Sequence, residues 1–202
     1  MSKIDYTKYE ITEYDNSSES YSHCRFINTN YPNIDYRIDY DYCYFEKIDF
    51  SNNDLTGTIY SNCYFIDCDF SNVNLNEVGI HNSVFKNCKF IGMNLSDSSI
   101  KNTIIEESNM KYSILSNSKL NDTKFIDSNL SNSSLFELVL KNTVFDSCNL
   151  SSASIQSTSL NSIDLSNCNL DKLSSNINNF KGSTINFEQA ISLIKNFDIQ
   201  VK

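Results

Sequence analysis

The sequence has few of the residues on which enzyme chemistry depends. It contains only two histidines, His23 and His81, which stand far apart among Asn, Ser and Cys. Its four glycines are isolated, so no glycine-rich loop is present to hold a phosphate group. Cys63 and Cys68 are close in sequence, but no further residue with metal-ligand spacing accompanies them. We therefore expect no catalytic site, no metal, no cofactor and no small-molecule substrate.

Long apolar segments are also missing. No hydrophobic stretch follows the initiator Met, and no apolar run elsewhere is long enough to cross a bilayer. The sequence thus predicts a protein that is neither secreted nor inserted in a membrane. Its seven cysteines occur at one inward position of a repeat, without the pattern of a disulfide framework, which fits a reducing compartment. We expect a cytoplasmic protein.

Basic residues are outnumbered by acidic ones. The chain has 16 Lys and Arg against 25 Asp and Glu, which gives a formal net charge of −9. Contacts to phosphates require Lys and Arg, so this charge disfavours nucleic acid and favours attraction to a basic surface. The expected partner is a protein with a basic surface, with no nucleic acid and no membrane.

What the chain does have is a repeat of five residues. Every fifth residue from Phe45 to Leu170 is large and apolar, without exception. With 40% hydrophobic residues in the chain, chance would produce this run with a probability of about 10⁻¹⁰. Five is neither the period of an amphipathic helix nor that of a strand, so the chain must turn a corner after each inward side chain. This pattern predicts a coil stacked on itself, a solenoid.

Two further positions of the repeat support a stacked coil. The residue two places before each large residue, from Cys43 to Cys168, is never charged and is most often Ser, Cys or Thr, which indicates burial. The residue two places after each large residue is Asn or Asp at 14 of 26 positions. Asn and Asp bond nearby backbone groups and tolerate strained dihedrals, so this position is expected at corners.

The spacing of Phe gives the length of one coil. All eight Phe of the run fall into two columns whose members differ by multiples of 20 residues, and cysteine pairs such as Cys43 and Cys63 are 20 apart. Twenty residues per coil means four sides, with equivalent residues stacked about 4.8 Å apart. Upstream, Phe26 and Tyr36 keep the five-residue spacing one residue out of frame, which predicts a one-residue deletion and a kink at about residues 37–39.

These patterns divide the chain into three parts. Residues 1–20 have no clear repeat and are expected to be a cap, a strand paired with the first coil, or a disordered segment. Residues 21–185 are expected to form the solenoid. Residues 186–202 are expected to form a C-terminal dimerisation helix and strand.

The C-terminal part has the spacing of an amphipathic helix over about residues 187–196. Asn186 is the expected N-cap, and Gln189 three residues later is close to a capping box. A helix at this end covers the last coil, and its remaining apolar surface needs a partner, most simply a second copy of the chain. We expect a homodimer interface formed by Phe187, Ala190, Ile191, Leu193, Ile194, Phe197, Ile199 and Val201.

Wrapping the chain at 20 residues per coil places acidic residues along one edge, opposed only by Lys47 and Lys86. Beside them, on the same side, a row of apolar residues should point outward, which suggests a contact surface. An ordinary solvated acidic face is the alternative. This row, the apolar ladder, is Tyr44, Tyr64, Val84, Ile104 and Val144. The acidic strip, our candidate partner-binding site, is Glu46, Asp67, Glu106, Glu107, Asp127 and Asp146.

The repeat resembles the pentapeptide-repeat family. Its pattern, x-[S/T/C/A]-x-[L/F]-x, covers residues 41–172 without an insertion, and the resemblance implies an all-β solenoid, a right-handed quadrilateral β-helix, here with a short C-terminal α-helix. The tail resembles the end of Qnr and MfpA type proteins, although several Qnr proteins carry projecting loops that this chain lacks. The resembling segments are Asn169–Leu173, Phe180–Gly182, Phe187–Ile194 and Ile199–Val201.

The resemblance to Qnr and MfpA type proteins also implies a function. Members of that subfamily are rod-shaped dimers joined through their C-terminal regions, and they bind DNA gyrase or topoisomerase IV, imitate duplex DNA and can protect the enzyme from quinolones. By resemblance, this chain is expected to be a DNA mimic that binds and modulates a type II topoisomerase. Two alternatives stay open: a structural or scaffold module that binds another protein, and a self-immunity protein without quinolone protection.

Overall fold

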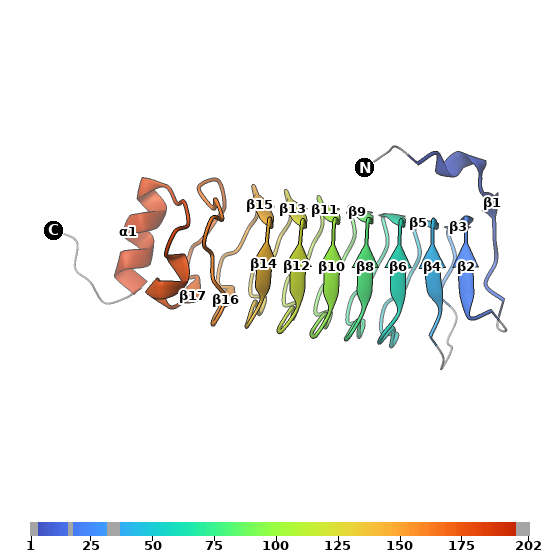
Figure 1. Ribbon diagram of the computed structural model, residues 1–202, viewed down its shortest axis with the longest axis horizontal. Helices are drawn as coiled ribbons and strands as arrows, with labels where there is room; N and C mark the ends of the chain where they lie inside the picture. The colour runs from blue at the N-terminus through green and yellow to red at the C-terminus, as the bar shows by residue number, and fades with distance from the viewer. Residues whose placement is uncertain (1–3, 16–17, 32–36, 197–202) are drawn as a thin grey trace.

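The computed structural model describes residues 4–15, 18–31 and 37–196, which form a rod of stacked coils (Figure 1). Along one side lie β1 (Glu10–Ile11), β3 (Cys24–Ile27), β5 (Tyr44–Glu46), β7 (Tyr64–Ile66), β9 (Val84–Lys86), β11 (Ile104–Glu106), β13 (Lys124–Ile126) and β15 (Val144–Asp146). A second side contains β2 (Ser20–Ser22), β4 (Asp39–Asp41), β6 (Ile59–Ser61), β8 (Gly79–His81), β10 (Ser99–Lys101), β12 (Lys119–Asn121) and β14 (Val139–Lys141). The remaining elements are β16 (Ser154–Ile155), β17 (Ser174–Ser175), the 3₁₀ helices η1 (Tyr6–Lys8) and η2 (Ile177–Phe180), and α1 (Phe187–Asn196).

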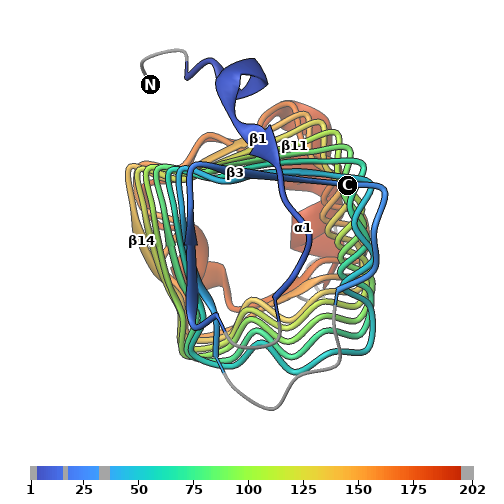
Figure 2. The same cartoon turned by 90° about the vertical axis from the view of Figure 1, so that its right-hand side faces the viewer.

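The strands of each side form a parallel sheet along the rod. One sheet has the order β1-β3-β5-β7-β9-β11-β13-β15, and the other has the order β14-β12-β10-β8-β6-β4-β2. Isolated β-bridges join the coils on the other two sides, as between Asp69 and Lys89 and between Asn74 and Asn94. Seen from its end, the rod is four-sided (Figure 2). The predicted fold, a quadrilateral β-solenoid of about eight turns with one short C-terminal helix, is confirmed.

Strand register confirms the coil length of 20 residues, since Phe65 pairs with Phe85. The first coil is one residue shorter, because Phe26 pairs with Phe45. Ile38 is already buried in the frame of the later coils. The change of frame therefore lies between Tyr31 and Ile38, a span that includes the first residue of the kink expected at residues 37–39. The expected inward Tyr36 lies outside the described residues.

The large residues of the repeat fill the inside of the rod. All of them from Phe45 to Leu170 are buried except Leu140, which is half-buried. Leu140 belongs to β14, the last strand of its sheet, so no strand of a following coil covers it. Phe rings stack in columns, with centroids 4.5 Å apart for Phe45 and Phe65 and 4.4 Å apart for Phe65 and Phe85. Stacked rings at these distances add to the stabilisation from burial.

The two remaining repeat positions also behave as expected. The small position is buried from Cys43 to Cys168 except at Asn53. Most of its hydroxyls are paired, as where Ser118 Oγ donates to the Leu95 carbonyl of the preceding coil at 2.7 Å, whereas Ser113 Oγ is buried without a hydrogen-bond partner among the described residues. Every corner residue except Asn167 has positive φ, including residues that are neither Asn nor Asp. Place in the coil, more than residue type, therefore fixes the corner conformation.

The N-terminal segment is attached to the first coil. β1 pairs in parallel with β3, so residues 10–11 add one strand to the eight-stranded sheet. Within residues 1–20, a strand paired with the first coil, one of the three expected possibilities, is found at residues 10–11. Within the described part of the chain, no helix is both long and apolar enough to cross a membrane.

The C-terminal helix α1 begins and ends at the expected residues. The N–H of Gln189 donates to Asn186 Oδ1 at 2.9 Å, and the N–H of Asn186 donates to Gln189 Oε1 at 2.7 Å, which is a complete capping box. Gln189 Nε2 also donates to the carbonyls of Leu165 (2.8 Å) and Cys168 (2.6 Å). Gln189 therefore both caps α1 and fastens it to the last coil, where Leu193 is buried.

Candidate functional site

The six residues of the acidic strip lie along one edge of the eight-stranded sheet. Three of them end a strand, and three occupy the corner that follows a strand. All six are half-buried or exposed. The strand-end residues are Glu46, Glu106 and Asp146, and the corner residues are Asp67, Glu107 and Asp127. The structure therefore brings together in one row all the acidic residues that were assigned to this strip from the sequence.

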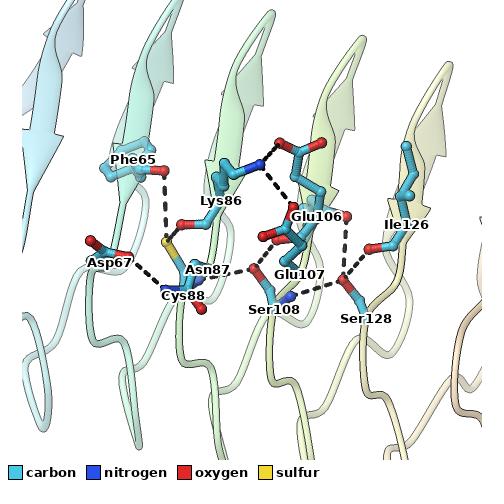
Figure 3. Close-up of polar contacts among 11 residues, drawn as sticks. Phe65, Asp67, Lys86, Asn87, Cys88, Glu106, Glu107, Ser108, Ile126 and Ser128 are labelled. Carbon is cyan, nitrogen blue, oxygen red and sulfur yellow. Dashed lines mark hydrogen bonds and ion pairs between the residues drawn. The ribbon is translucent and has the colours of Figure 1, made fainter.

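Lysine side chains partly neutralise the strip. Lys86 Nζ lies 2.8 Å from Glu107 Oε1 and 3.1 Å from Glu106 Oε1 (Figure 3). The hydrogen bonds that Lys86 donates to Glu107, which has the larger effect, and to Glu106 raise the pKa of Lys86. Lys47 Nζ lies 3.8 Å from Glu46 Oε1. The sequence placed both lysines on this edge, but it did not predict that one lysine bridges two consecutive glutamates.

The other carboxylates of the strip have neutral partners or none. Asn87 Nδ2 donates to Asp67 Oδ1 at 2.6 Å, as Figure 3 shows, and Asn167 donates to Asp146. Asp127 has no ion-pair partner among the described residues. An amide leaves the charge of a carboxylate in place. These three positions therefore present full negative charges to the solvent.

The apolar ladder follows the other edge of the same sheet. Tyr44 and Tyr64 stack with centroids 5.8 Å apart, and Val144 is 41% exposed. Tyr44 also donates to Glu46 Oε2 at 3.2 Å, which links the ladder to the acidic strip. Burial and the Glu46 carboxylate raise the pKa of Tyr44 to about 12. Lys124 occupies the ladder position between Ile104 and Val144 and interrupts it.

Sequence reasoning missed the N-terminal arm, residues 4–9, which covers one end of the ladder. The ring of Tyr6 lies 5.6 Å from that of Tyr44 and 5.9 Å from that of Tyr64. Its hydroxyl donates to the Asn62 carbonyl at 3.0 Å. The arm lies outside the repeat, and so its aromatic residues carry no register from which this contact could have been found.

The structure places the predicted dimer residues in four groups. Leu193 is buried within its own chain and is unavailable to a partner while α1 stays docked. Ala190, Ile191 and Ile194 are half-buried, and Phe187 is 78% exposed. The predicted interface residues that lie outside the described part of the chain are Phe197, Ile199 and Val201. The exposed apolar surface at this end is therefore centred on Phe187.

The histidines have ordinary surroundings. His23 stacks on Tyr42 with ring centroids 5.0 Å apart, and its Nδ1 lies 2.7 Å from Ser22 Oγ. His81 sits on β8, on a different coil. Among the described residues, no group of three or more His, Cys, Asp or Glu side chains is placed to hold a metal ion. The surface with the most distinctive chemistry is therefore the sheet face that carries the acidic strip and the apolar ladder.

Comparisons with known proteins agree with the repeat. A family model described as a pentapeptide repeat region matches residues 38–115, 58–135 and 78–151, and a model of pentapeptide repeats in eight copies matches residues 133–171. No curated protein gives a significant match.

Several solved structures are similar to this chain at low sequence identity. One is full-length QnrB1, a plasmid-mediated fluoroquinolone resistance protein, with 16% identity, a TM-score of 0.45, and coverage of 89% of this chain and 100% of that one. Another is HetL, a pentapeptide repeat protein involved in heterocyst differentiation regulation from the cyanobacterium Nostoc sp. strain PCC 7120. HetL is 13% identical, with a TM-score of 0.43 and coverage of 83% of this chain and 90% of that one.

Proposed function

The chain belongs to the pentapeptide-repeat family, and from this premise we propose that it is a binding protein, not an enzyme, whose cytoplasmic partner is a type II topoisomerase. The pentapeptide-repeat fold is typically non-catalytic. On this proposal the acidic strip imitates the charge of duplex DNA and binds the basic DNA-binding surface of DNA gyrase or topoisomerase IV. The resemblance of the C-terminal tail to Qnr and MfpA type proteins supports this choice of partner.

The alignment of the acidic strip is the observation that carries the proposal. From β5 to β15 the strip spans six adjacent strands, or about 24 Å at the usual strand spacing. Its six acids therefore average roughly one per 5 Å, against one phosphate per 3.4 Å along a DNA strand. Lys47 and Lys86 further reduce the net negative charge of the strip. The imitation is thus a sparse one, which favours electrostatic steering over a full replacement of the phosphate backbone.

A homodimer through the C-terminal end forms part of the proposal. The exposed Phe187 on α1 supports it, because a large apolar side chain on the end of a rod is stabilised by contact with a second copy. Two rods of about eight coils joined at this end would be about 80 Å long. That length would let one dimer extend across a wide basic surface.

A charge-neutralising variant tests the topoisomerase proposal. Glu106→Gln, Glu107→Gln and Asp127→Asn together remove three charges and leave Lys86 without its ion-pair partners, so the middle of the strip becomes basic. We expect gyrase binding to weaken by about tenfold or more at low salt. Circular dichroism and the melting temperature should stay near wild type, because these side chains point outward.

The matched control removes the same number of charges from another edge of the rod. It combines Glu77→Gln, Asp97→Asn and Glu137→Gln, all at exposed corners. This control should bind gyrase nearly as well as wild type. Equal binding by both triple variants would mean that the strip is an ordinary solvated acidic face. If wild type neither binds gyrase nor alters supercoiling at low salt, a scaffold module for another protein becomes the better explanation. Supercoiling with and without a quinolone separates inhibition from protection.

Light scattering tests the dimer. Phe187→Asp should convert a dimer into a monomer at micromolar concentration without loss of the β-sheet signal, because Phe187 contributes little to its own chain. Ile177→Asp is the matched control, since Ile177 is also exposed (56%) but lies on η2, outside the predicted interface. A monomeric wild type would refute the proposed dimer, and dissociation by both variants would place the interface elsewhere.

A further inference from the structure

A groove of about 680 Å³ lies between the N-terminal arm and the outer face of the eight-stranded sheet. Ile4 and Tyr6 of the arm line one part of it, and Tyr64 and Val84 of the apolar ladder line another. Its volume falls within the range of small-molecule sites, about 300–1,000 Å³. None of the described residues that line the groove carries a charged side chain. The groove therefore offers neutral groups: aromatic rings with their hydroxyls, aliphatic side chains and amides.

Tyr6 shows how an aromatic ring is held against this face. Its ring lies over Tyr44 and Tyr64, and its hydroxyl donates to the Asn62 carbonyl at 3.0 Å. Asn62 is a corner residue with φ of 55°. Burial raises the pKa of Tyr6, so its hydroxyl stays protonated and remains a donor. The ring packs over two adjacent strands, and the hydroxyl donates to the carbonyl of a corner residue. This arrangement is a binding position for a phenol, which we call a seat.

The same seat recurs one coil further along the ladder. Asn82 has φ of 51°, lines the groove, and offers a carbonyl that accepts no hydrogen bond from the described residues. Tyr64 and Val84, which are paired in adjacent strands, flank this second seat. Adjacent seats are separated by one strand spacing, about 4.8 Å, and aromatic pairs favour centroid distances of about 4.5–7 Å. A ring in the second seat would therefore stack beside Tyr6.

We propose that this groove binds an uncharged, planar hydroxyaromatic molecule in the second seat. Its ring packs on Tyr64 and Val84 beside Tyr6, and its hydroxyl donates to the Asn82 carbonyl. A charged aromatic molecule is disfavoured, since the lining offers no countercharge and burial of an unpaired charge is costly. Binding here does not depend on the topoisomerase proposal, because no residue of the acidic strip lines the groove.

Titration with 2-naphthol, followed by the fluorescence of the naphthol, tests the proposal; the chain has no tryptophan to interfere. Val84→Lys places a charged side chain in the second seat, and we expect binding to weaken by about tenfold or more. Val144→Lys is the matched control, since Val144 holds the same position in β15, outside the groove. That control should bind like wild type. Both changes are on outward positions, and circular dichroism will verify that both variants fold.

Two analogues test the chemistry of the seat. 2-Methoxynaphthalene keeps the ring but cannot donate a hydrogen bond, and it should bind about fivefold more weakly or worse. 6-Hydroxy-2-naphthoate adds a charge and should also bind more weakly. The proposal is overturned if the ether binds as well as the naphthol, if Val84→Lys and Val144→Lys behave alike, or if only tyrosine-bearing peptides bind while naphthol does not.

Discussion

Replacement of Gln189 by Ala should release the C-terminal helix from the rod. Gln189 makes three side-chain hydrogen bonds: it accepts from the N–H of Asn186 and donates to the carbonyls of Leu165 and Cys168. At about 1 kcal/mol for each bond, the change should lower the free energy of opening of α1 by about 3 kcal/mol. This corresponds to a rise of roughly 150-fold in the opening equilibrium constant.

Hydrogen exchange measured by mass spectrometry would detect this opening. In a solenoid each coil contacts only its neighbours, so faster exchange should be confined to α1 and the last coil. The matched control is Gln156→Ala, because Gln156 makes one exposed contact of 3.3 Å to Ser174 Oγ. That control should change the opening free energy by less than about 0.5 kcal/mol. Unchanged exchange of α1 in Gln189→Ala would refute the role given to this side chain, and faster exchange throughout the rod would refute its local character.

Three other changes have expected outcomes. Leu115→Ala empties an inward position that is fully buried, and urea denaturation should show a loss of about 2–5 kcal/mol; a loss below 1 kcal/mol would contradict the packed interior. Tyr60→Phe removes a buried hydroxyl with no hydrogen-bond partner among the described residues, so the free energy of unfolding should rise by about 1 kcal/mol, and a decrease would reveal a hidden partner. The hydroxyl and N–H of Thr56 lower the pKa of Asp54 from its ordinary value of 3.8, so the stability that its carboxylate contributes is present above that pH and is lost as the pH falls below it. Asp54→Asn should reduce the fall in melting temperature at low pH. An unchanged fall would mean that other carboxylates cause it.

Most of the fold could be predicted because one physical rule is applied at every coil. An unpaired charge is excluded from the inward positions, and the sequence from Cys43 to Leu170 obeys this exclusion without exception. The five-residue period of the large residues then predicted the length of one side, and the Phe columns predicted the number of residues in one coil. The capping box of Asn186 and Gln189 was also readable, since it is formed by residues three apart.

The candidate site was only partly predictable. Wrapping at 20 residues fixes which coil and which edge a residue occupies, and the acidic strip depends on nothing else. The bridge from Lys86 to Glu106 and Glu107 depends on side-chain rotamers, which the period does not fix. The contact of Tyr6 with Tyr44 and Tyr64 joins a segment without a repeat to one with a repeat, and no spacing rule relates the two.

The 19-residue register of the first coil, against 20 in the coils that follow, has a consequence for how such a chain can change its length during evolution. Loss of one residue there keeps Phe26 over Phe45, because the whole difference is absorbed within a single turn near the end of the rod. In the middle of the rod, the same loss would have to be absorbed between coils that stack on both sides. Gene duplication or deletion of a complete 20-residue unit would instead preserve every corner and every inward column. Rod length should therefore change in evolution by whole coils, each about 4.8 Å long. The outward residues can diverge independently of this change.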